Sequence, residues 1–195
     1  MNNKIIKIDI DGVLRDMLSE MCIIYNKAYN TNITPNDISD YNVDISFPLC
    51  KEIDGISANY FFFNEYSYDL CAYSKVINKS KEAIDILHNL GYYIIIVSYQ
   101  KGYSNKHDTL VWLDNNNIYY DSICFTDRKD LVHGDIIIDD NPEFLDMCND
   151  DEEKILIDAP YNKNNNKYKR VNLLYDYACY LKALNKKIPL TIYNK

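Results

Sequence analysis

Short runs of apolar residues alternate along the chain with longer segments that carry apolar residues at helical spacing. The short runs are rich in Ile and Val, and they predict strands. These predicted strands cover residues 4–10, 92–98, 122–125, 135–139 and 154–157. The longer segments predict amphipathic helices. These helices cover residues 17–29, 79–89, 105–115 and 172–184, and a further helix opens at residues 141–143.

Strands that alternate with helices predict an α/β fold with a mostly parallel sheet between helices, which is a Rossmann-like three-layer core. In such a sheet, ligands bind at the carboxyl ends of the strands. We expect the last helix, residues 172–184, to pack on the sheet edge. Residues 30–75 break the alternation, because Pro35, Pro48 and Gly55 interrupt them.

Polar side chains stand at or beside the carboxyl ends of the predicted strands. They are Asp9, Asp11, Ser98, Lys129, Asp139 and Asp140. Carboxylates that converge in a crevice repel each other unless a cation neutralises them, and an all-oxygen site suits Mg²⁺. A lysine ammonium and a serine hydroxyl are natural partners of phosphate oxygens. Because a carboxylate can also attack phosphorus to give an aspartyl-phosphate, these residues fit two-step phosphoryl transfer.

Four ordered motifs make the chain resemble the haloacid dehalogenase superfamily of phosphatases. They are Asp9-Ile10-Asp11-Gly12-Val13-Leu14, Ser98, Lys129 and Ile138-Asp139-Asp140. Within that superfamily the chain is similar to the 5'(3')-deoxyribonucleotidase family. The similarity lies in residues 9–16, 61–65, 126–129 and 134–140. The chain departs from the usual family pattern at residues 98–100, which read Ser-Tyr-Gln instead of Thr-Ser-Pro, and at Met17, which replaces a base-stacking aromatic residue.

The resemblance implies a catalytic role for each motif. Asp9 would be the nucleophile. Asp11 would protonate the leaving oxygen and then deprotonate the attacking water. An acid at this second position is typical of the phosphatases in the superfamily, whereas its phosphotransfer ATPases lack one. Ser98 and Lys129 would hold the phosphoryl oxygens.

The resemblance also implies a Mg²⁺ site. The ion would bind Asp9, the backbone carbonyl of Asp11 and Asp139. Asp140 would be either a further ligand or a neighbour of the ligands.

The superfamily places a cap between its first two motifs, so the resemblance implies a small, mainly helical cap inserted after the first strand. The cap would span residues 17–75, and the core would comprise residues 1–16 and 76–195. Aromatic side chains in a cap could stack on a nucleobase, but such residues more often form the core of the cap itself. The candidate substrate contacts are Tyr41, Phe61, Phe63, Tyr99 and Lys101.

Composition narrows the classes of partner. The chain has 195 residues, with 29 Asp and Glu against 21 Lys and Arg, and this acidic balance argues against binding to a nucleic-acid polymer. A bound cation can still reverse the field locally, so a small phosphorylated substrate remains compatible. No apolar run approaches the length of a membrane span. Six cysteines without a C-x-x-C pair are typical of free thiols in a reducing compartment, so we expect a cytoplasmic protein.

The leading hypothesis is a Mg²⁺-dependent phosphatase that hydrolyses (deoxy)nucleoside monophosphates through an aspartyl-phosphate intermediate. A phosphatase of another small phosphomonoester, such as a sugar phosphate, is the alternative within enzymes. A receiver-like phospho-switch and a non-catalytic binding protein are alternatives of another class. A homodimer is also compatible with the sequence.

Overall fold

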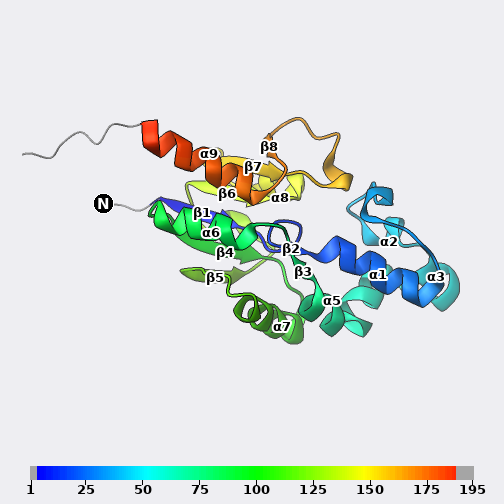
Figure 1. Cartoon of the computed structure of the whole chain (residues 1–195). Helices are drawn as coiled ribbons and strands as arrows, with labels where there is room; N and C mark the ends of the chain where they lie inside the picture. Colours follow the sequence, from blue (N-terminus) through cyan, green and yellow to red (C-terminus); the bar gives the residue numbers. More distant parts are fainter. Residues whose placement is uncertain (1–3, 188–195) are drawn as a thin grey trace, which may run out of the picture.

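A parallel sheet forms the centre of the molecule in a computed structural model that describes residues 4–187 (Figure 1). The strands are β1 (Ile5–Ile8), β4 (Tyr93–Ser98), β5 (Ser122–Phe125), β6 (Ile136–Asp139), β7 (Glu153–Ile157) and β8 (Lys169–Val171). They lie in the order β5-β4-β1-β6-β7-β8, and every neighbouring pair is parallel. The prediction of a mostly parallel sheet is therefore confirmed. Because β1 lies between β4 and β6, the carboxyl ends of these three strands meet.

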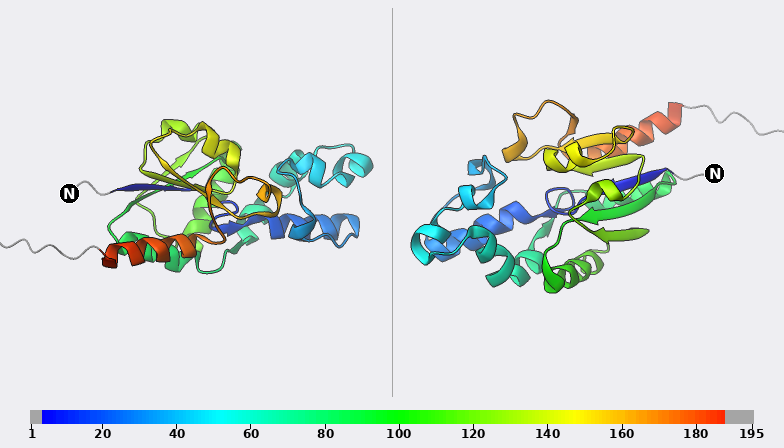
Figure 2. Two further views of the ribbon diagram at one scale, coloured as in Figure 1. Left: turned by 90° about the horizontal axis from the view of Figure 1, so that it is seen from above. Right: turned by 180° about the vertical axis from the view of Figure 1, so that it is seen from behind.

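Helices cover both faces of this sheet (Figure 2). On one face, α6 (Ser80–Asn89), α7 (Gly102–Asn115) and α9 (Leu174–Lys187) pack against alternate strand residues such as Ile6 and Ile8. On the other face, α8 (Pro142–Met147) buries Leu145 against Ile137 and Leu156. The alternation of buried residues along each strand thus produces the predicted three layers.

The local predictions are met in part. The last helix, α9, contacts the edge strand β8 as expected, and it also lies beside α6 with Tyr177 buried in the main core. Helix α7 begins at Gly102, three residues before the predicted start at residue 105. Strand β8 was not predicted, because its Lys169-Arg170-Val171 sequence has too few apolar residues to indicate a strand.

A group of short helices lies beyond the carboxyl ends of the strands, at the right of Figure 1. The chain enters it from β2 (Arg15–Asp16) and leaves it into β3 (Lys75–Val76), and these two strands pair in antiparallel fashion. The elements between them are α1 (Met17–Tyr29), η1 (Pro35–Asp37), α2 (Val43–Ser46), α3 (Leu49–Asp54), α4 (Ala58–Tyr60), η2 (Phe61–Glu65) and α5 (Ser67–Tyr73). They share a hydrophobic cluster distinct from the core of the sheet.

No helix in the part of the chain that the structure describes is long and apolar enough to cross a membrane. All six cysteines fall within the described residues and are free, as the sequence predicted. Four of them are buried, whereas Cys124 and Cys179 are partly exposed.

Candidate active site

A cavity of about 730 Å³ lies between the carboxyl ends of the strands and the helices that connect β2 to β3. Its floor comes from strand ends and the loops that follow them. These floor residues include Asp9, Asp11, Ser98, Lys129, Asp140 and Asn141. Its opposite wall is largely apolar and comes from α1 and the segment after it. These wall residues include Met17, Leu18, Met21, Ile38, Tyr41 and Phe47. The sheet topology thus brings the polar strand ends to one place, as expected for a parallel sheet.

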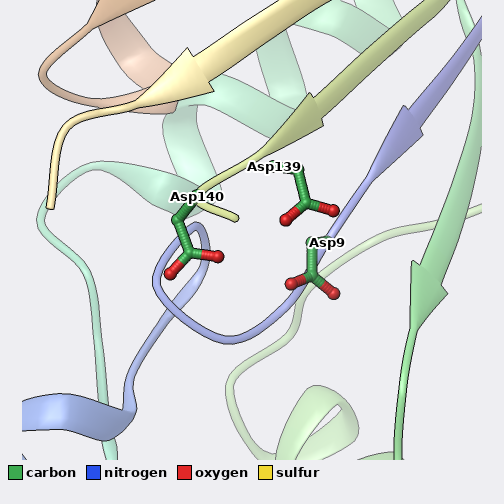
Figure 3. A group of neighbouring side chains, drawn as sticks. All are labelled: Asp9, Asp139 and Asp140. Carbon is green, nitrogen blue, oxygen red and sulfur yellow. The ribbon is translucent and has the colours of Figure 1, made fainter. Parts of the chain in front are cut away.

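Three carboxylates lie close together, as Figure 3 shows, and two of them, Asp9 and Asp140, line this cavity. Asp9 follows β1, Asp139 ends β6, and Asp140 is the next residue. Each offers an oxygen, and these oxygens all lie within 4.8 Å of one another. The three residues are at most 8% exposed. The backbone holds the cluster in place, because Asp9 N donates to Ile138 O at 3.0 Å.

One buried ammonium faces these carboxylates. Lys129 Nζ lies 2.6 Å from Asp139 Oδ2 and 3.0 Å from Asp9 Oδ1, and the residue is only 1% exposed. The ammonium also lies over the ring of Phe144, 4.3 Å from its centroid. Burial alone would lower the pKa of Lys129, but the two carboxylates outweigh burial and raise that pKa above its usual value. Lys129 is therefore cationic at any physiological pH.

The negative charges are only partly compensated. Burial, followed by the charges of Asp139 and Asp11, raises the pKa of Asp9 to about 7, against the lowering effect of Lys129. Burial, followed by the charges of Asp139 and Asp9, also raises the pKa of Asp140 well above its usual value. Among the described contacts, the one ammonium near these three buried carboxylates is that of Lys129. Three buried carboxylates facing one ammonium leave a net negative charge, which fits a divalent metal ion with oxygen ligands.

A tight turn after β1 lets the cluster form. Gly12 has φ of +77°, in the left-handed region that favours glycine, and an added Cβ would overlap the Asp140 carboxylate. The backbone of Arg15 closes the loop, because Gly12 N donates to Arg15 O at 2.9 Å. Glycine is therefore needed here both for the backbone conformation and for the close approach of Asp140.

Asp11 stands apart from the three clustered carboxylates. Arg15 Nε donates to its Oδ1 at 2.7 Å, and Gln100 Nε2 donates to its Oδ2 at 2.7 Å. Gln100 also donates to Ser98 Oγ at 3.2 Å, so the amide links the second motif to Asp11. Ser98 lines the cavity at the end of β4 and is 1% exposed. The four motifs therefore meet around one cavity.

The expected substrate contacts do not all reach the cavity. Tyr41, Phe63, Tyr99 and Lys101 line it. The structure does not bring Phe61 there, because its ring is buried in the helical segment, against Phe62, Tyr29 and Tyr66. The aromatic run 60–63 is thus divided between the interior of this segment and the cavity wall.

Several residues at the site were not singled out in the sequence. Tyr161 lies in η4 (Pro160–Asn162), its hydroxyl donates to Asp140 Oδ2, and its ring packs edge-on against Tyr41. Its position after β7 is a strand carboxyl end, so the general rule could have found it. Gln100 follows the carboxyl end of β4, so the same rule could have found it. The contacts of Arg15 could not have been found this way, because they depend on the path of the chain in space.

Comparisons with known sequences cover almost the whole chain. A family model described as 5' nucleotidase, deoxy (pyrimidine), cytosolic type C matches residues 3–184. A 5'(3')-deoxyribonucleotidase from Clostridium acetobutylicum is 30% identical over 188 residues, which cover 94% of this chain and 98% of the relative. A 5'(3')-deoxyribonucleotidase from Bacillus subtilis is 28% identical over 172 residues, which cover 86% of this chain and 92% of the relative.

Solved structures with the same architecture are more distant in sequence. A haloacid dehalogenase-like hydrolase from Bacillus subtilis, bound to magnesium, has a TM-score of 0.60 at 13% identity and covers 93% of this chain and 99% of that chain. A phosphonoacetaldehyde hydrolase-like protein from Oleispira antarctica has a TM-score of 0.58 at 12% identity, and the match covers 95% of this chain and 94% of that chain. At these identities, the likeness shows the fold alone.

Proposed function

The chain belongs to the cytosolic type C 5' nucleotidase family within the haloacid dehalogenase superfamily, and we propose that it hydrolyses deoxynucleoside monophosphates to deoxynucleosides and phosphate. The observation that carries the proposal is the buried Asp9, Asp139 and Asp140 cluster, faced by Lys129, at the floor of a cavity with an apolar wall. The charged floor suits a phosphate, and the apolar wall suits a sugar and base.

We propose Mg²⁺ as the metal. Asp9, Asp139 and Asp140 would hold it, and the backbone carbonyl of Asp11 is a further candidate ligand. When bound, the ion would offset the repulsion between the carboxylates and an incoming phosphate. The balance of charges supports this assignment, because three buried carboxylates that face a single ammonium are costly without a further cation.

Asp9 would begin the reaction as the nucleophile. One of its carboxylate oxygens would attack phosphorus, and the bond between phosphorus and the ester oxygen of the nucleoside would break. Lys129 would sit beside the transferring group and balance its charge, and Ser98 would donate a hydrogen bond to a phosphoryl oxygen. Both side chains line the cavity on the same floor as Asp9.

Asp11 would move the protons. It would give a proton to the departing nucleoside oxygen and later take one from the water that attacks the phospho-enzyme. That water would cleave the acyl-phosphate bond, release inorganic phosphate and restore the Asp9 carboxylate. In the structure both Asp11 oxygens accept hydrogen bonds, Oδ1 from the charged Arg15 and Oδ2 from the neutral Gln100. A proton would be carried more readily by Oδ2, because its partner is uncharged.

The helices between β2 and β3 would act as the cap, with residues 17–75 as cap and residues 1–16 and 76–195 as core. The described cap residues form their own hydrophobic cluster, and they supply most of the apolar wall of the cavity. Tyr41 and Phe63 on the cap and Tyr99 on the core are placed where a ring could stack on a base. Lys101, over the Tyr99 ring, could reach a phosphate.

A substrate panel with nucleophile variants tests this function. The wild-type protein with Mg²⁺ should release phosphate from deoxynucleoside monophosphates faster than from sugar phosphates. Asp9→Asn should lower kcat at least ~10³-fold, because an amide oxygen is a poor nucleophile. Asp114→Asn, a change at an exposed site in α7, is the matched control and should keep full activity.

Three outcomes would contradict the proposal. Undiminished phosphate release by Asp9→Asn would reject the mechanism. A preference for sugar phosphates would favour the alternative metabolite phosphatase. A long-lived phospho-aspartate without turnover would favour a phospho-switch.

A further inference from the structure

A second buried lysine lies beneath the active site. Lys7 stands in β1, two residues before Asp9, and is 0% exposed. Its neighbours Ile6 and Ile8 face the main core, so the alternation of the strand points Lys7 to the opposite face of the sheet. Nothing in the proposed reaction uses this ammonium, which makes its contacts informative.

Those contacts bind the loop between β5 and β6. Lys7 Nζ donates to Lys129 O at 3.1 Å and to Val132 O at 2.7 Å. It also forms an ion pair with Glu152 at 2.7 Å, and the Glu152 side chain is only 2% exposed. The aliphatic stem of Lys7 packs under Gly134, where an added Cβ would lie 2.9 Å from Lys7 Cγ.

The loop has little regular structure of its own. Between β5 and β6 its described helical content is the single turn η3 (Lys129–Leu131). The carbonyl of Lys129 and that of Val132, on either side of Asp130 and Leu131, are both held by the one ammonium. Lys7 thus anchors the main chain of the residue whose side chain reaches Asp9 and Asp139.

Stability alone is a weak reason for such an arrangement. Replacing a buried ion pair by apolar residues of similar volume is often neutral or stabilising, because the pair must be removed from water. An ammonium, however, has several donors that converge on fixed acceptors, and an apolar side chain would leave the two carbonyls free to move. A methionine could fill the same volume, but it could not hold the Lys129 and Val132 carbonyls in fixed positions.

We propose that Lys7 is a positioning residue for Lys129, and that the buried Lys7–Glu152 pair fixes the loop so that the Lys129 ammonium stands between Asp9 and Asp139. This proposal rests on the proposed phosphatase function, in which Lys129 balances the negative charge of the transferring phosphoryl group. Lys7 itself touches neither substrate nor carboxylate cluster among the described contacts.

The test uses two variants at the pair. Lys7→Met removes the ammonium, but it leaves Glu152 buried without a partner and can destabilise the fold. The double variant Lys7→Met/Glu152→Gln removes both charges and keeps the volume of the pair. Lys154→Met is the matched control. Lys154 Nζ donates to the carbonyl of Cys148, whose Sγ lies 3.9 Å from Lys7 Nζ, but Lys154 has no hydrogen bond or ion pair with residues 126–134 among the described contacts.

Activity is then measured in a double-mutant cycle. We expect the double variant to lose ~10- to 100-fold in kcat with a small change in KM, as is typical when a support behind an active-site group is removed. In a Lys129→Met background the same two changes should lower kcat by less than a further ~2-fold, because the residue through which they act is gone. Lys154→Met should keep wild-type kcat in both backgrounds.

Amide hydrogen exchange in the metal-free protein gives a readout that needs no activity. The double variant should exchange faster in residues 126–134 than the wild type, while β1 and β6 stay protected. Lys154→Met should leave this segment unchanged.

The outcomes separate the two proposals. A folded double variant with wild-type kcat and unchanged exchange would overturn the role of Lys7, and so would an equal loss with and without Lys129. A wild-type protein that releases no phosphate would instead overturn the proposed function, and faster exchange in residues 126–134 would then still support Lys7 as the anchor of the loop.

Discussion

At the scale of single residues, the site is an unbalanced set of buried charges. Asp9 and Asp139 share one ammonium, that of Lys129, and Asp140 lies beside them. Burial, followed by the charges of neighbouring carboxylates, raises the pKa of Asp9 and of Asp140. A cation is the natural complement of this set. The acidity of the whole chain is therefore compatible with a phosphorylated ligand.

This imbalance predicts a pH-dependent metal affinity. The pKa of Asp9 is raised to about 7, so a proton competes with the metal below that pH. We expect Mg²⁺ affinity, measured by calorimetry, to be ~10-fold weaker at pH 6 than at pH 8. Asp9→Asn should bind Mg²⁺ more weakly with little change over this range, and a flat profile in the wild type would contradict the prediction.

The raised pKa of Asp9 also sets how the stability of the metal-free protein depends on pH. Since the folded pKa of Asp9 lies above that of an unfolded aspartate, the proton stabilises the metal-free fold. The contribution is fully present below about pH 4 and is lost as the pH rises to about 7. Saturating Mg²⁺ should reverse this trend, because it binds the ionised form.

At the scale of elements, the decisive feature is the turn between β1 and β2. Gly12 adopts positive φ and leaves room for the Asp140 carboxylate, while Gly55 adopts positive φ with nothing near its Cβ position. The two glycines therefore separate the effect of backbone conformation from that of a close approach.

Substitution by alanine tests this difference. Gly55→Ala should cost about 1–2 kcal/mol of unfolding free energy, the cost of placing an L-residue in the left-handed region. Gly12→Ala should cost more, and it should also weaken Mg²⁺ binding at least ~10-fold because Asp140 must move. Urea unfolding and calorimetry measure the two quantities, and equal losses with unchanged metal binding would show that the approach of Asp140 is unimportant.

The helices between β2 and β3 explain why residues 30–75 show no clear pattern of secondary structure in the sequence. Helix α2 has four residues and α3 has six, and such short helices are not stable by themselves. They form because Phe47 and Cys50 are buried in the cluster of the cap. Helix α1, in contrast, has 13 residues with a capping Asp16 and was predicted with the same bounds.

At the scale of the whole molecule, Arg15 joins the helices between β2 and β3 to the helices that cover the sheet. It lies in β2, is 0% exposed, and its Nη1 donates to the carbonyl of Cys71 in α5 and to Thr109 Oγ1 in α7. Its Nε binds Asp11, and its guanidinium stacks on Trp112, 5.3 Å from the ring centroid. A movement of α5 would therefore be transmitted to Asp11 through the side chain of Arg15.

Arg15→Met tests this connection. We expect a loss of about 2–4 kcal/mol in unfolding free energy, because several buried acceptors lose their donor. Arg128→Met removes an exposed ion pair with Asp130 and should cost clearly less unfolding free energy, because water screens an exposed pair. Urea unfolding compares the two variants, and equal losses would mean that Arg15 does not hold cap and core together.

The sequence by itself determined the parallel sheet, the approximate bounds of the main core strands and helices, and the motif residues, because hydrophobic periodicity and motif order are local properties of the chain. Only the tertiary structure decided which side chains meet. The contacts of Asp11 with Gln100, of Asp140 with Tyr161 and of Lys7 with the Lys129 carbonyl join positions 21 to 122 residues apart. Such contacts depend on strand order, on the facing of each strand and on loop paths, which no local pattern encodes.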